Sequence, residues 1–138
     1  MDEKVLVNRL ARICAQFKSG KKLFVWGNMT RAYFATGLPS PTRYYYWTGL
    51  SVDGFLDQKE MQETIALLDN PDVIIADKLT VFSTQDNSIF QDNPFSRDSQ
   101  FKIALRKLVK EKFHRITPDG FWPIVYEHRL CSDGKLKE

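Results

Sequence analysis

Histidines and cysteines, which commonly carry catalysis or bind metal ions, are few in this chain, and their spacing matches no motif. The 138 residues contain two histidines, His114 and His128, and two cysteines, Cys14 and Cys131. The cysteines form no CxxC pair and have no histidine at the spacing of a zinc site. Glycine-rich phosphate loops, a nucleophile elbow and carboxylates at a spacing suited to acid–base catalysis are also missing. We therefore expect no catalytic residue, no metal and no cofactor here.

The four residues named above have simpler interpretations. His114 and His128 fall in a predicted C-terminal hairpin, where they could be cross-strand neighbours and where surface polar roles are expected. Cys14 falls on a predicted helix and is expected to be a buried free thiol. Cys131 falls in the tail, and pairing of the two cysteines in an oxidising compartment stays open.

A basic stretch over residues 97–115 is the strongest local charge feature. It holds seven Lys and Arg residues against two acidic ones, in a chain whose net charge is only +3. Lys102, Arg106 and Lys110 recur every four residues, so they should share the side of a helix opposite Phe101 and Leu105. Such a row could meet anionic lipid headgroups or phosphates, and the alternative is an ordinary solvated helix face. The mild overall charge predicts no nucleic-acid partner.

The residues around these positions alternate between helical and strand patterns. In the first half we expect a helix over 2–18, a buried strand over 23–26, and two helical turns over 28–36 with Ala32, Tyr33 and Phe34 among the inward residues. An aromatic strand over 43–48 should point half of its rings into the core, which makes a sugar-binding platform the weaker interpretation. Asn28 is expected to cap a helix rather than to carry a glycan.

In the second half, Asp57 and Glu60 form a predicted capping box. A helix follows that stops at Asn70-Pro71, then a buried strand over 73–76 and a long polar loop over 83–99. A third helix begins near Phe101, and the runs 114–117 and 121–129 predict a hairpin. The whole chain, 1–138, is therefore predicted to be one α/β domain of layered αβα type, with a mixed sheet of four to five strands, a C-terminal β-hairpin and a flexible tail at 132–138.

The most specific pattern of the chain lies in residues 23–46. It is made of Leu23-Phe24-Val25-Trp26-Gly27, then Tyr33, Gly37, Pro39 and Pro41, then Arg43-Tyr44-Tyr45-Tyr46. This pattern resembles the soluble region that follows the last membrane helix in polytopic type-C glycosyltransferases, the protein mannosyltransferase and aminoarabinose transferase group. The later runs 71–75 and 121–129 are similar to that region in their order of elements.

The resemblance implies a non-catalytic C-terminal domain of a membrane glycosyltransferase that uses a polyprenyl-phosphate-linked sugar donor. The catalytic carboxylate of that family lies in loops between membrane helices, so no catalytic residue carries over. The domain would lie on the extracytoplasmic (periplasmic) side of the cell membrane, with the membrane-spanning part of the same enzyme and an anionic lipid surface as partners. It would cover the active site or orient the acceptor. The resemblance implies structural roles for Trp26, Gly27, Tyr33, Gly37 and Arg43, the glycines through backbone conformation and close packing and Arg43 as a buried or edge charge partner.

Two other interpretations stay open. No apolar run approaches the roughly 20 residues of a membrane helix, and the start of the chain is no signal peptide. The chain could therefore be a free-standing cytosolic α/β module that binds a ligand or a protein. It could also be a small enzyme that uses the polar segment 83–99 as a lid, although no nucleophile-and-base arrangement supports this.

Overall fold

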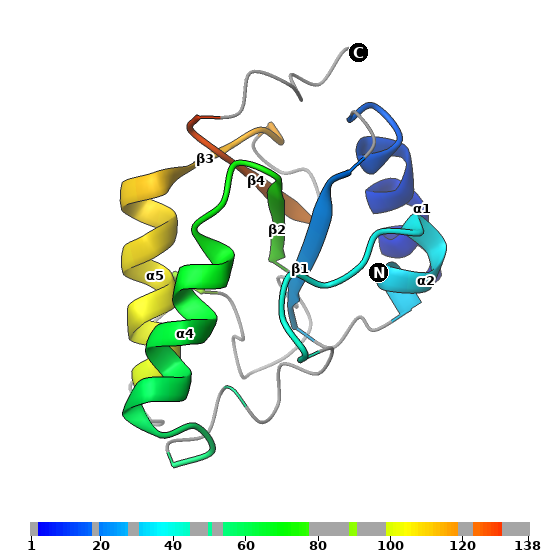
Figure 1. Cartoon of the computed structure of the whole chain (residues 1–138). Coiled ribbons are helices and arrows are strands. Elements are labelled where there is room, and N and C mark those ends of the chain that lie inside the picture. Colours follow the sequence, from blue (N-terminus) through cyan, green and yellow to red (C-terminus); the bar gives the residue numbers. More distant parts are fainter. Residues whose placement is uncertain are drawn as a thin grey trace.

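The computed structural model describes residues 3–17, 20–27, 31–44, 50, 54–77, 89–90, 99–118 and 123–130. Within these residues, helices lie on both faces of an open mixed sheet (Figure 1), which confirms the predicted α/β class and the C-terminal hairpin. The elements in chain order are α1 (Glu3–Cys14), β1 (Lys22–Trp26), α2 (Arg31–Thr36), α4 (Gln58–Leu68), β2 (Val73–Asp77), α5 (Gln100–Lys112), β3 (Phe113–Arg115) and β4 (Ile124–His128).

The described sheet has the strand order β1-β2-β4-β3. β1 and β2 are parallel, with Leu23 opposite Ile74, whereas β4 is antiparallel to both β2 and β3. β2 and β4 are buried along their whole length. The apolar run 73–76 predicts this burial for β2 only, because β4 also buries Glu127 and His128. The carboxyl ends of β1 and β2 lie side by side, with Trp26 opposite Asp77.

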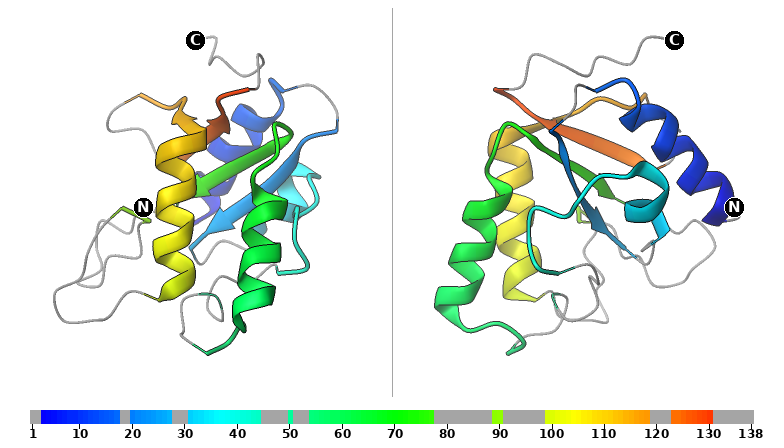
Figure 2. Two further views of the ribbon diagram at one scale, coloured as in Figure 1. Left: turned by 60° about the vertical axis from the view of Figure 1, so that its left-hand side comes forward. Right: turned by 45° about the vertical axis from the view of Figure 1, so that its right-hand side comes forward.

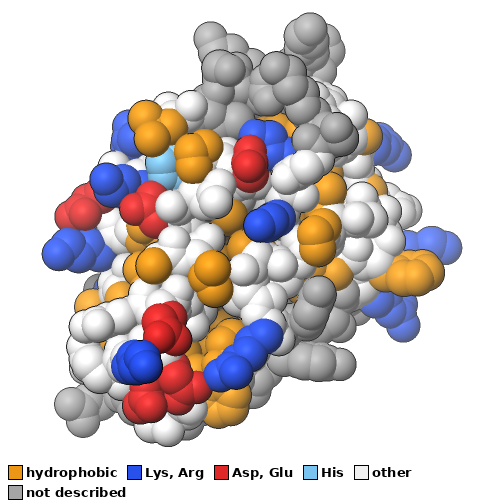
Figure 3. All heavy atoms as spheres, viewed as in Figure 1, with side chains coloured by type: hydrophobic (Ala, Val, Ile, Leu, Met, Phe, Trp, Pro, Cys, Tyr) orange, Lys and Arg blue, Asp and Glu red, His pale blue; other side chains and the backbone are white. Residues whose placement is uncertain are grey.

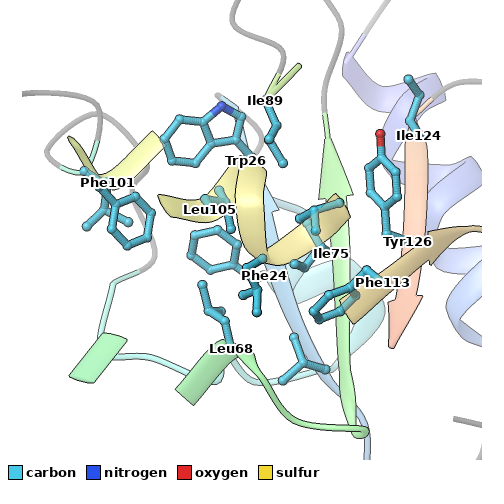
Figure 4. Packing of buried hydrophobic residues seen from close by; sticks show 14 residues of the cluster. Phe24, Trp26, Leu68, Ile75, Ile89, Phe101, Leu105, Phe113, Ile124 and Tyr126 are labelled. Carbon is cyan, nitrogen blue, oxygen red and sulfur yellow. The ribbon is translucent and has the colours of Figure 1, made fainter. Parts of the chain in front are cut away.

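Two hydrophobic clusters fill the space on either side of the sheet. One cluster lies under α4 and α5 and contains Phe24, Trp26, Phe101 and Tyr126, which Figure 4 shows together. The other lies under α1 and α2 and contains Leu10, among others. The two views of Figure 2 separate these helix pairs on opposite faces of the sheet.

The two longer helices that cover the first cluster begin at capping residues. The predicted capping box is present in α4, where Asp57 Oδ1 accepts from the backbone N–H of Glu60 at 2.7 Å. In α5, Ser99 Oγ accepts from the N–H of Lys102 at 3.0 Å. Local sequence therefore determines where both helices start.

Several expected details differ in the structure. α1 ends at Cys14, before the predicted end at residue 18. Phe34 is 94% exposed, not inward, because it lies on the opposite side of α2 from the buried Ala32. Arg43 and Tyr44 lie outside any strand. The rest of the predicted aromatic strand, Asn28, most of the polar loop 83–99, the hairpin turn at 119–122 and the tail lie outside the described residues.

Candidate functional site

The sequence pattern of residues 23–43 comes together along the outer edge of β1. This strand is the last in the described sheet, so the backbone N–H groups of Leu23 and Val25 point away from β2. Leu23 donates to the carbonyl oxygen of Pro39 at 2.9 Å, and Val25 donates to Tyr33 Oη at 3.0 Å. An edge with unpaired N–H groups is a template for pairing with other chains. The tyrosine and the Gly/Pro loop therefore close this edge.

The two glycines of the pattern serve backbone conformation. Gly27 has φ 124° and Gly37 has φ 70°, values in the region that favours glycine. A Cβ on Gly37 would meet no atom within 4 Å, so close packing is not the reason for this glycine. Beside Gly27, Trp26 is buried and stacks on Phe101 with ring centroids 6.0 Å apart. The pattern thus turns the chain sharply after a buried strand.

Arg43 is an exposed charge partner, because its side chain is 73% exposed and its Nη2 lies 2.8 Å from Glu60 Oε2 on α4. It also donates to Tyr44 Oη at 3.0 Å. The hydrogen bond to Tyr44 is the largest of the effects that raise the pKa of the guanidinium, and the charge of Glu60 adds to it. Arg43 is therefore not a buried charge partner, and its ion pair with Glu60 lies at the surface.

A groove lies beside this ion pair, between residues 41–44 and α4. Its volume is about 280 Å³. Figure 3 shows acidic and basic side chains around hydrophobic ones near the end at which α4 begins. Carboxylates, a guanidinium and hydroxyl groups share this groove, so it could bind a polar ligand. The groove is lined by Pro41, Thr42, Arg43, Tyr44, Glu60, Glu63, Thr64 and Leu67.

A smaller hollow of about 140 Å³ lies between the starts of α4 and α5. One of its polar lining residues, Asp57, already caps α4. Ser99, next to the lining residue Gln100, caps α5 and donates to the carbonyl oxygen of Leu50 at 3.1 Å.

Two residues of the predicted basic row on α5, Arg106 and Lys110, contact Ile89 and Phe90 of the long polar loop. Lys102 is 8% exposed, so the expectation that the row points away from the core is wrong for this residue. Arg106 Nε donates to the carbonyl oxygen of Ile89 at 2.9 Å, and Lys110 Nζ lies 5.8 Å from the centre of the Phe90 ring. Contact of this row with lipid or phosphate stays a prediction, and of the three residues only Lys110 is exposed.

Ile89 is also held from the other side, by Asp77 at the carboxyl end of β2. Asp77 is fully buried, and its Oδ2 accepts from the N–H of Ile89 at 3.1 Å. Both backbone groups of Ile89 are therefore bound by charged side chains, Asp77 and Arg106. We call these three residues the Ile89 clamp. Phe90 adds an edge contact to Tyr126, with ring centroids 5.8 Å apart.

Tyr126 shows how the buried charge of Asp77 acts on its surroundings. Burial raises the pKa of the Tyr126 hydroxyl well above its ordinary value, and the negative charge of Asp77 raises it further, against a smaller lowering effect of Arg115. The phenol therefore stays neutral at physiological pH.

Each histidine pairs with a carboxylate and not with the other histidine, so the expected cross-strand pair is wrong. In the register of β3 and β4, His114 lies opposite Glu127 and His128 lies opposite Phe113. His114 Nε2 lies 2.9 Å from Glu127 Oε1. The carboxylate of Glu127 is buried, and its other oxygen, Oε2, has no hydrogen-bond partner among the described residues. Consecutive residues 127 and 128 point to opposite faces of the sheet, so the two pairs are separated by β4.

His128 is buried, which corrects the expected surface role. Its Nδ1 accepts from the backbone N–H of Leu130 at 3.2 Å, and its Nε2 lies 2.7 Å from Asp69 Oδ1. Because a backbone N–H can only donate, Nδ1 is unprotonated and Nε2 carries the proton. The pair ties the hairpin to the end of α4, and the described surroundings contain no nucleophile hydrogen-bonded to it.

Cysteine and metal chemistry are limited in the described part of the chain. Cys14 is a buried free thiol, as predicted, and burial raises its pKa to about 12. Cys131 lies outside the described residues. Across the described ranges, no group of three or more His, Cys, Asp or Glu side chains is placed to hold a metal ion, and no helix there is long and apolar enough to cross a membrane.

Sequence reasoning missed Asp77 and Ile89. A charged residue directly after four apolar strand residues, and an isolated Ile-Phe pair in a polar run, were the available indications. Comparison with known proteins adds nothing, because no family model, curated protein or solved structure matches the chain.

Proposed function

We propose that this chain is a non-catalytic extracytoplasmic domain of a membrane glycosyltransferase that uses a polyprenyl-phosphate-linked sugar donor. Its partner is then the membrane-spanning part of the same enzyme, where the domain covers the active site or orients the acceptor. The proposal starts from the resemblance of residues 23–46 to the soluble region of type-C glycosyltransferases.

One structural observation carries the non-catalytic part of the proposal. The residues of the resembling pattern that the structure describes are used to build the fold. Tyr33 and Pro39 close the edge of β1, Gly27 and Gly37 adopt positive φ, and Trp26 is packed in the core. A pattern whose residues are occupied in this way supports a scaffold role more than a reaction centre.

The reading frame upstream of this chain in the natural gene tests whether the chain is part of a membrane protein. We expect it to encode several apolar segments of about 20 residues, each long enough to span a bilayer. A reading frame that opens at Met1 would contradict the proposal.

The purified chain tests the non-catalytic role. We expect it to transfer no sugar from a polyprenyl-phosphate mannose donor to a peptide acceptor. Transfer that disappears when one residue of this chain is changed would overturn that role and leave the family assignment in place.

A second candidate, a free-standing module that binds a ligand, is favoured by the groove beside Arg43. Its volume of about 280 Å³ is at or below the lower end of the roughly 300–1,000 Å³ common for ligand pockets, which ranks this candidate second. NMR titration with maltose and adenosine monophosphate tests it. Shifts that centre on Arg43 and Glu63, and that vanish in Arg43→Gln, would favour the module.

A further inference from the structure

The positive charge of the chain is concentrated in its first third. Residues 1–44 contain eight Lys and Arg against two acidic residues, whereas residues 45–138 contain 12 basic and 15 acidic residues. The basic stretch of α5 therefore lies within a part of the chain that is negative overall. We therefore expect a surface that attracts anions on the helices and strands formed by residues 1–44.

Two of these elements, α1 and α2, form the layer on one side of the sheet (Figures 1 and 2). Together they carry four basic residues and a single acidic one, Glu3. The basic residues are Lys4, Arg9, Arg12 and Arg31. Figure 3 shows hydrophobic and basic side chains together at the edge of the molecule where α1 and α2 lie.

The outer faces of these helices combine arginine with exposed apolar side chains. On α1, Val5 and Arg12 are exposed at positions that share one side of the helix. On α2, Arg31 and Phe34 are three residues apart and both exposed. We call Val5, Arg12, Arg31 and Phe34 the α1–α2 surface.

Phe34 is the most exposed apolar residue of this surface. Its ring is 94% exposed, more than any other large hydrophobic side chain of the described residues. An aromatic ring among basic residues is the composition of protein surfaces that lie in the boundary between lipid headgroups and acyl chains. The guanidinium groups of the arginines can pair with lipid phosphates through two parallel hydrogen bonds.

The row on α5 is a poorer candidate for the same contact. Lys102 is buried, and Arg106 is bonded to Ile89 in the clamp. Neither residue can turn to a lipid phosphate without leaving its place in the fold.

We propose that the α1–α2 surface lies against an anionic lipid bilayer, with the Phe34 ring inserted at the headgroup boundary and Arg12 and Arg31 on lipid phosphates. The inference deepens the proposed function, and it rests on that function in taking a membrane as the source of negative charge. It places the membrane beside α1 and α2, on the opposite side of the sheet from the predicted row of α5.

Sedimentation of the purified chain with vesicles tests this surface. We expect binding to vesicles of phosphatidylglycerol and phosphatidylcholine at low salt, and none to phosphatidylcholine alone. Each basic residue near an anionic surface strengthens partitioning by about fivefold, so Arg12→Gln with Arg31→Gln should weaken binding by about 25-fold. The matched control, Lys107→Gln with Lys112→Gln, removes the same charge from exposed positions of α5 and should change binding little.

Variants of Phe34 distinguish insertion of the ring into the bilayer from electrostatic attraction of the whole chain to it. Phe34→Ser should reduce binding without changing charge, and Phe34→Trp should add fluorescence that brominated lipids quench. Equal losses in the two double variants, or no quenching at Phe34→Trp, would overturn the proposal. So would a lack of binding at low salt, or a dimer that Phe34→Ser converts to a monomer while vesicle binding is unchanged. None of these outcomes alters the upstream reading frame, so the proposed function is judged separately.

Discussion

The phenol of Tyr33 accepts the outward-facing N–H of Val25 at 3.0 Å, on the side of β1 where the described sheet has no further strand. Both groups are buried, and they are eight residues apart in the chain. A buried N–H without a partner costs about 1–3 kcal/mol. The pattern therefore contains a tyrosine because its hydroxyl accepts a backbone N–H of the preceding strand.

Removal of this hydroxyl should destabilise the fold. We expect Tyr33→Phe to lower the free energy of unfolding by about 1–3 kcal/mol, because Val25 N–H loses its acceptor. Urea denaturation followed by circular dichroism measures the change. Tyr44→Phe is the matched control, since that hydroxyl bonds the exposed Arg43, and it should cost less than about 0.5 kcal/mol. Equal costs for the two variants would contradict the edge-closing role.

Gly27 should tolerate no side chain. With φ 124°, any Cβ brings backbone strain, so Gly27→Ala should destabilise by about 1–3 kcal/mol. The thermal and urea midpoints report this cost. If strain is the cause, Gly27→Leu should cost about as much as Gly27→Ala, because neither side chain is branched at Cβ. A small cost for alanine and a much larger one for leucine would instead indicate close packing.

The Ile89 clamp should protect one amide from solvent. In Asp77→Ala the N–H of Ile89 loses a charged acceptor, a loss that costs about 1.5–3 kcal/mol. Hydrogen exchange at Ile89 should accelerate together with the drop in stability. Glu111→Ala, which removes an exposed carboxylate from α5, should leave both nearly unchanged. Unaltered exchange at Ile89 in Asp77→Ala would show that the clamp does not hold this segment.

Cys14 should be unreactive in the folded protein. Its pKa of about 12 leaves almost no thiolate at pH 8. In a Cys131→Ser background, Ellman's reagent should react with Cys14 only after denaturation. Because the folded thiol holds its proton more tightly than the unfolded one, with its ordinary pKa of 9.0, this residue's contribution to stability is complete below about pH 9 and falls as pH rises towards 12. Rapid reaction of the folded protein would contradict the burial.

What the sequence determined by itself is local. The capping box of Asp57 and Glu60 starts α4 because both partners lie within one helical turn. The short apolar runs 23–26 and 73–76 predict buried strands, and they become β1 and β2. The alternation of helices and strands predicts a mixed sheet, and the structure shows that β1 and β2 are its parallel pair. Trp26, Gly27 and Gly37 were singled out as structural, and burial and positive φ account for them.

The tertiary structure decided which side chains meet across the sheet. Periodicity places Lys102, Arg106 and Lys110 on one side of α5, but only packing shows that Ile89 and Phe90 occupy that side. The composition of β3 and β4 does not determine their register, because a slip of one residue changes every cross-strand partner. Only the structure shows that His114 lies opposite Glu127 and not opposite His128. The exposure of Phe34 has the same origin. A short helix has apolar residues on both sides, and the elements packed beside it determine which side is buried.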